Sequence, residues 1–163
     1  ARPLRLRIVA VGRLKAGPER ELVDRYLDRA AKSGRALGFT RLDSREYAES
    51  RAARSDDRRA EEAAAILADL EPGAALVALD ETGRGLSSEE FARWIAARRD
   101  AGCGDLVMAI GGPDGHGSAV RTRADLTLAF GVMTWPHQMV RLMLAEQIYR
   151  AMTILSGHPY HRA

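Results

Sequence analysis

Residues 74–112 have the sequence AALVALDETGRGLSSEEFARWIAARRDAGCGDLVMAIGG, and this stretch decides the fold class. It begins with AALVALD and ends with DLVMAIGG, two short apolar runs of the kind that form strands buried on both faces of a sheet. Between them, Ser87 and Glu90 have the spacing of a capping box, which predicts a helix over SEEFARWIAARRDA. A strand, a helix and a second strand in this order predict two parallel strands joined by a crossover helix.

The remainder of the chain continues this alternation of strands and helices. Further strands are predicted for LRLRIVAVG (4–12), ALGFTRLDS (36–44) and DLTLAFG (125–131). Further helices are predicted for PERELVDRYLDRAAK (18–32), RAARSDDRRAEEAAAILADL (51–70), a short AVRTRA (119–124) and a closing helix that starts near Pro136. We therefore expect an α/β fold, a mostly parallel sheet with helices on both faces, built as a single domain over residues 1–163.

The closing helix differs from an ordinary surface helix because its apolar side chains point in almost every direction. A surface helix has one apolar stripe and one polar face. The apolar residues that surround this helix are Met139, Val140, Leu142, Leu144, Ile148 and Met152. Other structure must therefore cover both of its sides, and the HPYHR tail that follows must lie near something polar.

The amino-acid composition is compatible with an anionic partner but does not identify one. The net charge is +3, and of the 25 basic residues only Lys15 and Lys32 are lysines. Arginine contacts phosphates and stacks on bases, which favours RNA, but a genome rich in arginine codons explains the composition equally well. The single cysteine, Cys103, fits a reducing cytoplasm, and no apolar run reaches the length of a membrane span. Cys103 has no neighbours with metal-ligand spacing, so we expect no metal site.

In an open parallel sheet, ligands bind at the carboxyl ends of the strands, where three loops are predicted here. These loops are Asp80–Leu86, Gly111–Ser118 and Gly131–Pro136. GGPDGHGS lacks the lysine of a phosphate-binding loop, although a flavin or nucleotide site remains an alternative, as does a plain turn. FGVMTWPHQ suits a flat heteroaromatic ligand such as adenine, held by main-chain atoms. The alternative is that Trp135 only packs the helix against the sheet.

Four segments taken together point to a known family. LDETGRGLSSEEFA, IGGPDG, MTWPHQMVRLMLAEQIYRA and HPYHR resemble the RlmH family of SPOUT-class methyltransferases, and the likeness covers essentially the whole chain. The resemblance implies S-adenosylmethionine as cofactor and N3 of a pseudouridine in 23S ribosomal RNA of the large ribosomal subunit as the methyl acceptor. It also implies a C-terminal trefoil knot, a homodimer and a cytoplasmic location.

The same resemblance assigns roles to individual residues. It places the cofactor on Leu79, Gly111, Phe130, Gly131, Val132, Met133, Thr134 and Trp135. His116 stands in the glycine-rich loop where an apolar residue is more usual. The candidate catalytic residues lie at the end of the chain, near the cofactor in a site shared between subunits. They are His161 as proton acceptor or base contact, Tyr160 as a stacking residue, and Arg150 at the RNA phosphate or dimer interface.

Each catalytic assignment has a structural alternative. Arg150 is one helical turn after Glu146, so the two residues can form an ion pair, and His161 can be a solvated tail residue. We expect His137 to cap the closing helix. For RNA contacts, the candidates are Arg2, Arg5, Arg7 and Arg13 near the start of the chain, and Arg121 and Arg123 in the short helix. A non-catalytic, dimeric ribosome-assembly factor on the same fold is the alternative function.

Overall fold

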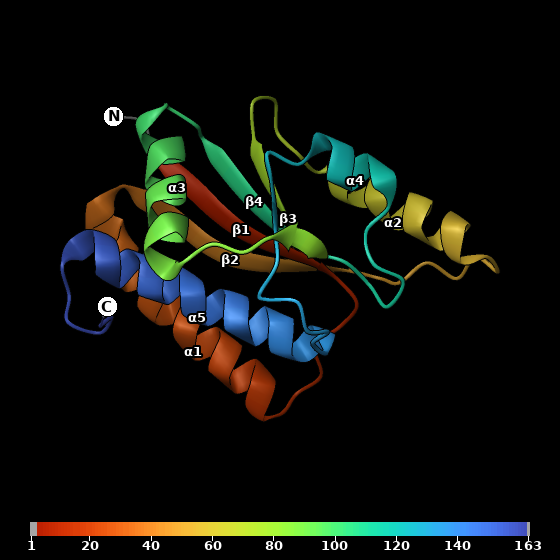
Figure 1. Cartoon of the computed structure of the whole chain (residues 1–163), viewed down its shortest axis with the longest axis horizontal. Coiled ribbons are helices and arrows are strands. Elements are labelled where there is room, and N and C mark those ends of the chain that lie inside the picture. Colours follow the sequence, from red (N-terminus) through yellow and green to blue (C-terminus); the bar gives the residue numbers. More distant parts are fainter. Residues whose placement is uncertain (1–2, 163) are drawn as a thin grey trace.

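The computed structural model describes residues 3–162 and contains a five-stranded parallel sheet with the strand order β2-β1-β4-β3-β5 (Figure 1). In chain order, the elements are β1 (Leu4–Val11), α1 (Pro18–Gly34), η1 (Arg35–Leu37), β2 (Phe39–Tyr47), α2 (Ser55–Ala68), β3 (Ala75–Arg84), α3 (Ser88–Asp100), β4 (Asp105–Ile110), α4 (Ser118–Arg123), β5 (Leu126–Leu128) and α5 (His137–Ser156). The predicted α/β class and the parallel sheet are confirmed.

Helices cover both faces of the sheet, as predicted. The larger core lies on the face that packs against α1, α3 and α5, and it includes Leu6, Ile8 and Met108. The smaller core lies under α2 and α4 and includes Val9 and Val107. Figure 1 shows α1, α3 and α5 on one side of the strands and α2 with α4 on the other. Consecutive residues of β1 and β4 thus enter opposite cores, which explains their continuous apolar sequence.

Strand β3 is longer than predicted. The sequence predicted a loop over Asp80–Leu86, but the strand continues through a bulge to Arg84, which pairs with Leu128 of β5. The Arg84 carbonyl accepts a hydrogen bond from the Ala129 amide at 2.9 Å. A Cβ atom on Gly83 would lie 2.7 Å from the Leu128 backbone nitrogen. The polar segment therefore pairs because its glycine lets β5 approach closely, a contact that apolar patterning does not reveal.

The start of β2 also differs from its predicted position by a few residues, whereas the start of α3 does not. Strand β2 starts at Phe39 rather than at residue 36, because Arg35–Leu37 form the 3₁₀ turn η1. Helix α3 begins after a complete capping box between Ser87 and Glu90, as predicted.

Helix α5 is covered on most of its circumference. Helices α1 and α3 both contact it, and Leu144, Ile148 and Met152 are almost completely buried. Its first turns are more exposed, and Met139 is 37% exposed. The described chain thus covers the middle of the helix by itself, whereas the start of the helix lies open. The trefoil knot that the family resemblance implies stays a prediction.

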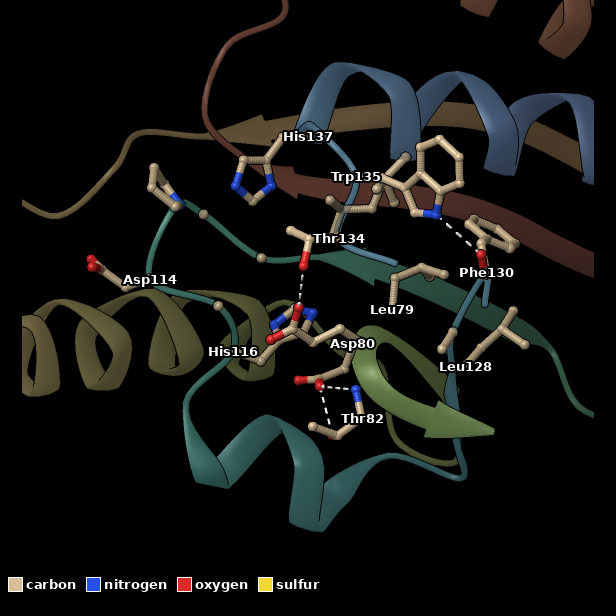
Figure 2. A pocket seen from close by; sticks show the side chains of 18 of the residues that line it. Leu79, Asp80, Thr82, Asp114, His116, Leu128, Phe130, Thr134, Trp135 and His137 are labelled. Carbon is tan, nitrogen blue, oxygen red and sulfur yellow. Dashed lines mark hydrogen bonds between the residues drawn. The ribbon is translucent and has the colours of Figure 1, made fainter. Parts of the chain in front are cut away.

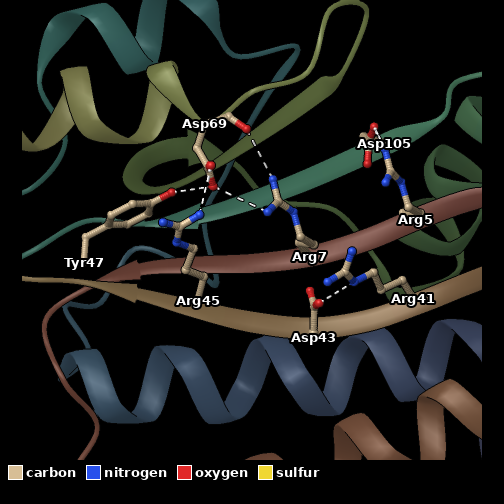
Figure 3. Close-up of polar contacts among 8 residues, drawn as sticks. All are labelled: Arg5, Arg7, Arg41, Asp43, Arg45, Tyr47, Asp69 and Asp105. Atoms are coloured by element: carbon tan, nitrogen blue, oxygen red, sulfur yellow. Dashed lines mark hydrogen bonds and ion pairs between the residues drawn. The ribbon is translucent and has the colours of Figure 1, made fainter.

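A polar network joins side chains of β1 and β2 to the residue that follows α2 (Figure 3). Arg7, Arg45 and Tyr47 all converge on Asp69, which follows α2. Tyr47 donates to the Asp69 carboxylate at 2.6 Å, and Arg45 donates at 3.0 Å. The hydrogen bond from Tyr47 lowers the pKa of Asp69, and the two arginines add to this effect against the opposing effect of burial. The network therefore ties the end of α2 to β1 and β2.

This network makes a pH-dependent contribution to stability. Because the pKa of Asp69 is lower in the folded than in the unfolded chain, its contribution is complete above the unfolded pKa and is lost as the pH falls through the folded pKa. We expect Asp69→Asn to lower the free energy of unfolding by roughly 1–2 kcal/mol at neutral pH and by almost nothing in acid. Urea unfolding across this range measures the difference, with exposed Asp24→Asn as control. An equal loss at every pH would contradict this account.

Candidate functional site

A cavity of about 400 Å³ lies at the carboxyl ends of β3, β4 and β5 (Figure 2). Its walls come from the middle of β3, from the segments that follow β4 and β5, from Arg121 of α4 and from the first turn of α5. Seven of the eight predicted cofactor residues line it: Leu79, Gly111, Phe130, Gly131, Met133, Thr134 and Trp135. Val132 does not line it, because its side chain is fully exposed to solvent. The volume lies within the usual range for small-molecule sites.

The glycine-rich loop after β4 forms one wall and folds back on itself. The Gly115 amide donates to the Gly112 carbonyl at 2.9 Å, and Gly115 has a φ of +82° that favours glycine. A Cβ atom on Gly111 would lie 3.0 Å from the Gly115 carbonyl carbon and 3.1 Å from the His116 nitrogen. The tight turn thus requires the absence of a side chain at Gly111, which leaves backbone rather than side chain facing the cavity.

The loop between β5 and α5 forms the opposite wall. The indole of Trp135 donates to the Phe130 carbonyl at 3.1 Å, so the side chain folds over its own loop. The hydroxyl of Thr134 donates to the Glu81 carboxylate at 3.2 Å, which links this loop to β3. Met133 is 71% exposed and Trp135 is 40% exposed. The wall combines apolar side chains with the backbone of a loop that lies outside any helix or strand, an arrangement suited to a flat ring.

The polar side of the cavity is organised by Asp80. Its carboxylate accepts from the amide of Thr82 at 2.9 Å and from the hydroxyl of Thr82 at 2.7 Å, and it lies 3.6 Å from Arg121. Burial raises the pKa of Asp80, but the hydrogen bonds from Thr82 and the charge of Arg121 outweigh this effect, so the pKa is lowered. The cavity therefore contains a fixed negative charge at neutral pH.

His116 is a buried histidine that lines this cavity. His116 is only 3% exposed, and its Nε2 atom lies 3.0 Å from the Ala109 carbonyl oxygen. Burial lowers the pKa of His116, so the ring is neutral at neutral pH and Nε2 must be the protonated donor. The ring ties the glycine-rich turn to β4. This contact gives a structural reason for a polar residue at a position where the family resemblance leads one to expect an apolar one.

A buried ion pair fixes the start of α5 next to the cavity. Arg141 is 8% exposed, contacts the Glu46 carboxylate and donates to the Gly12 carbonyl at 3.1 Å. The Leu14 amide donates to the same carboxylate at 2.7 Å. Burial raises the pKa of Glu46, but Leu14 and Arg141 together lower it by more. The ends of β1 and β2 thus hold the turn of α5 that presents His137 and Val140 to the cavity.

The three candidate catalytic residues form one cluster at the other end of α5. Arg150 contacts the Glu146 carboxylate at 2.9 Å and lies over the Tyr160 ring, 4.8 Å from its centroid. The Tyr160 hydroxyl donates to Glu146 at 2.8 Å. Burial raises the pKa of Tyr160, and Glu146 raises it further. The predicted ion pair between Glu146 and Arg150 is therefore present, and Tyr160 and His161 pack onto α5 instead of extending into solvent.

Within one chain, the tail cluster and the cavity lie far apart. His137 lines the cavity and Arg150 belongs to the cluster, and the 1.5 Å rise per residue of a helix separates them by about 20 Å. The expectation that the tail lies near the cofactor, in a site shared between subunits, stays a prediction.

The arginines proposed for RNA contacts have mostly internal partners. Arg121 donates to the His116 carbonyl at 2.8 Å, and Arg123 contacts Asp125 and the Ala74 carbonyl. Arg5 pairs with Asp105 at 2.7 Å. Both side chains thus also hold the fold, and Arg121 lines the cavity, while their contact with RNA stays a prediction. Arg13 is exposed, whereas Arg2 lies outside the described residues.

Sequence reasoning missed the partners of Asp80 and Glu89, and for Glu146 it predicted the ion pair with Arg150 but not the hydrogen bond from Tyr160. Asp80 organises the cavity wall, Glu146 binds both Arg150 and Tyr160, and Glu89 contacts His161. Acidic residues at helix starts and on helix surfaces are common, so their types alone carry no signal. Among residues 3–162, no three His, Cys, Asp or Glu side chains are grouped to hold a metal ion. In the same range, no helix has the length and apolarity needed to cross a membrane.

The similarity to known proteins extends over almost the whole chain. A family model described as Predicted SPOUT methyltransferase matches residues 4–161. A protein named Ribosomal RNA large subunit methyltransferase H from Chelativorans sp. (strain BNC1) is 58% identical over 98% of this chain and 91% of its own length. Proteins of the same name from Brucella anthropi and Xanthobacter autotrophicus are 56% and 59% identical, each over 98% of this chain and 100% of its own length. The chain therefore belongs to the SPOUT methyltransferase family, within the group named ribosomal RNA large subunit methyltransferase H.

Proposed function

We propose that this protein transfers a methyl group from S-adenosylmethionine to N3 of a pseudouridine in 23S ribosomal RNA. The observation that carries this proposal is the cavity at the strand ends, built from the segments that the family resemblance assigns to the cofactor. Similarity to ribosomal RNA methyltransferases over almost the entire chain supports the choice of substrate. The reaction belongs in the cytoplasm, where ribosomes are found.

The cavity residues fit S-adenosylmethionine in size and chemistry. The absence of a side chain at Gly111 leaves room for a ligand beside the backbone, and the Phe130–Trp135 loop offers carbonyl and amide groups to an adenine ring. The ionised Asp80 provides a negative charge that suits a positively charged sulfonium compound. Bound there, the cofactor would supply an electrophilic methyl group.

The chain contributes to the reaction mainly by positioning and by handling one proton. Fixed orientation of two reactants lowers a barrier by as much as about 7–11 kcal/mol in favourable cases. The rigid glycine turn and the loop anchored by Thr134 and Trp135 can hold a ligand in one orientation. N3 of pseudouridine is an imide nitrogen that must lose its proton to become nucleophilic. His161 is our candidate acceptor for this proton, with Arg150 placed to stabilise the anion.

We further propose that the enzyme acts as a homodimer in which the tail of one copy completes the cavity of the other. The separation of about 20 Å between His137 at the cavity and Arg150 in the tail cluster of one chain supports this arrangement. Apolar side chains are exposed beside the cavity at Val132, Met133, Trp135 and Met139. A groove of about 270 Å³ between α1 and α5, lined by Tyr26, Phe130 and Leu142, continues this surface.

The proposal predicts methyl transfer to intact ribosomes. Purified protein and radiolabelled S-adenosylmethionine are incubated with ribosomes that contain the unmethylated pseudouridine, and the labelled position is mapped by mass spectrometry of 23S RNA. We expect one methyl group per ribosome at N3, and none on ribosomes with uridine in place of the pseudouridine. Cofactor binding without transfer would contradict the enzymatic function and favour the non-catalytic assembly factor.

A further inference from the structure

Glu89, in the first turn of α3, contacts the predicted proton acceptor although it lies 72 positions away in the sequence. Its Oε1 atom lies 2.7 Å from Nε2 of His161. The imidazole side chain is 17% exposed and the carboxylate is 38% exposed, so the contact lies at the edge of the packed surface. This carboxylate belongs to neither the cavity nor the tail.

The partners of His161 determine which of its ring nitrogens carries the proton. The Nη1 group of Arg150 lies 3.1 Å from Nδ1, and a guanidinium can only donate a hydrogen bond. Nδ1 must therefore be the acceptor, which leaves the proton on Nε2, where it is donated to Glu89. The hydrogen bond with His161 lowers the pKa of Glu89, so the carboxylate is ionised at neutral pH. One neutral tautomer satisfies both contacts.

From this geometry, we infer that Glu89 is a positioning residue that holds His161 in the tautomer whose Nδ1 accepts the N3 proton of the substrate. The inference rests on the proposed function. The N3–H bond breaks, the proton moves to Nδ1, and the electron pair stays on N3. As N3 bonds to the methyl carbon, the methyl–sulfur bond of the sulfonium would break and leave a neutral thioether. The resulting imidazolium retains its Nε2–H hydrogen bond to Glu89, whose negative charge stabilises it. A carboxylate behind a histidine base has this effect in other enzymes.

Arg150 can release Nδ1 of His161 to the substrate while its guanidinium group stays in position. Its Nε and Nη2 atoms contact Glu146 at 3.4 and 2.9 Å, so these contacts hold the guanidinium when Nη1 is released. The freed N–H group would then lie beside the developing N3 anion. The charged and titratable groups around His161 are thus Glu89 from α3, Arg150 and Glu146 from α5, and Tyr160 from the tail.

The tautomer of His161 can be measured independently of activity. Nitrogen-15 NMR of histidine-labelled protein distinguishes Nε2–H from Nδ1–H rings, and His161→Asn identifies the signal. We expect the Nε2–H form in the wild type and in Glu89→Gln, whose amide oxygen still accepts. We expect a mixture of tautomers in Glu89→Leu. Asp57→Asn, which removes a first-turn carboxylate from α2, should leave the ring unchanged.

Kinetics then test the positioning role. For Glu89→Leu, we expect kcat for ribosome methylation to fall roughly tenfold or more, as for loss of an oriented base, with KM and cofactor affinity unchanged. Glu89→Gln should retain part of the rate, and thermal unfolding should show that both variants fold. An unchanged tautomer or an unchanged kcat in Glu89→Leu would overturn the inference. A wild-type protein that transfers no methyl group would instead refute the proposed function. The NMR measurement would still decide whether Glu89 determines the tautomer of His161.

Discussion

Gly111→Val should abolish binding of S-adenosylmethionine while the chain remains folded. The first added atom would lie 3.0 Å from the Gly115 carbonyl carbon, so a valine side chain would displace the turn that forms one wall of the cavity. The neighbouring atoms belong to the backbone of a tight turn, so no side-chain rotation can relieve the contact. We expect the dissociation constant measured by calorimetry to rise by roughly hundredfold or more, a loss of about 2.7 kcal/mol.

Gly85→Val is the matched control for this substitution. A Cβ atom at Gly85 would meet no atom within 4 Å, and Gly85 does not line the cavity. We therefore expect cofactor affinity to be unchanged in this variant. Equal affinity in Gly111→Val and wild type would show that the cofactor does not occupy this cavity. If Gly111→Val does not fold, the smaller substitution Gly111→Ala is measured in its place.

A mixture of Gly111→Val and His161→Ala chains should methylate ribosomes, although neither variant should do so alone. If each site combines the cavity of one chain with the tail of another, a mixed dimer has one intact cavity opposite one intact tail. Random assembly places the two variants together in about half of the dimers, each with one working site. We therefore expect about one quarter of the wild-type rate in single-turnover methylation after the chains are mixed and reassembled.

The control for this experiment carries both substitutions in one chain. A mixture of Gly111→Val with the double variant Gly111→Val/His161→Ala contains no intact cavity, so it should be inactive. Failure of the first mixture to exceed the separate variants would mean that each chain provides its own tail. Such a result would require a rearrangement that brings the tail about 20 Å along α5 to its own cavity.

Patterning alone predicted the fold class and most of the elements. The continuous apolar runs around Val77 and Val107 indicated a sheet buried on both faces, and the spacing of Ser87 and Glu90 located the start of α3. It did not predict the end of β3, because Glu81–Arg84 are mostly polar and pair only through the close approach of β5 at Gly83. Such a contact depends on two backbones and leaves no periodic signal.

The candidate site was predictable in part for a similar reason. Gly111 and the Phe130–Trp135 loop follow strand ends, and strand ends meet at one edge of a parallel sheet. The contact between Glu89 and His161 was not predictable, because nothing in the sequence relates the first turn of α3 to the tail. The partners of Arg121 and Arg123 were also hidden, since a short helix with exposed arginines has the same sequence whether it binds RNA or its own backbone.

The position of β1 between β2 and β4, inside the sheet, has a consequence for how the protein acquires its structure during synthesis. β1 leaves the ribosome before the other four strands of the sheet, yet its neighbour β4 follows much later, and the paired Arg5 and Asp105 are 100 positions apart. At translation rates of 5–20 residues per second, the nascent strand waits roughly 5–20 s for this partner. Throughout this time, its apolar edge is open to other chains. We therefore expect folding to complete only after translation ends, and the unfinished N-terminal half to be a client of chaperones.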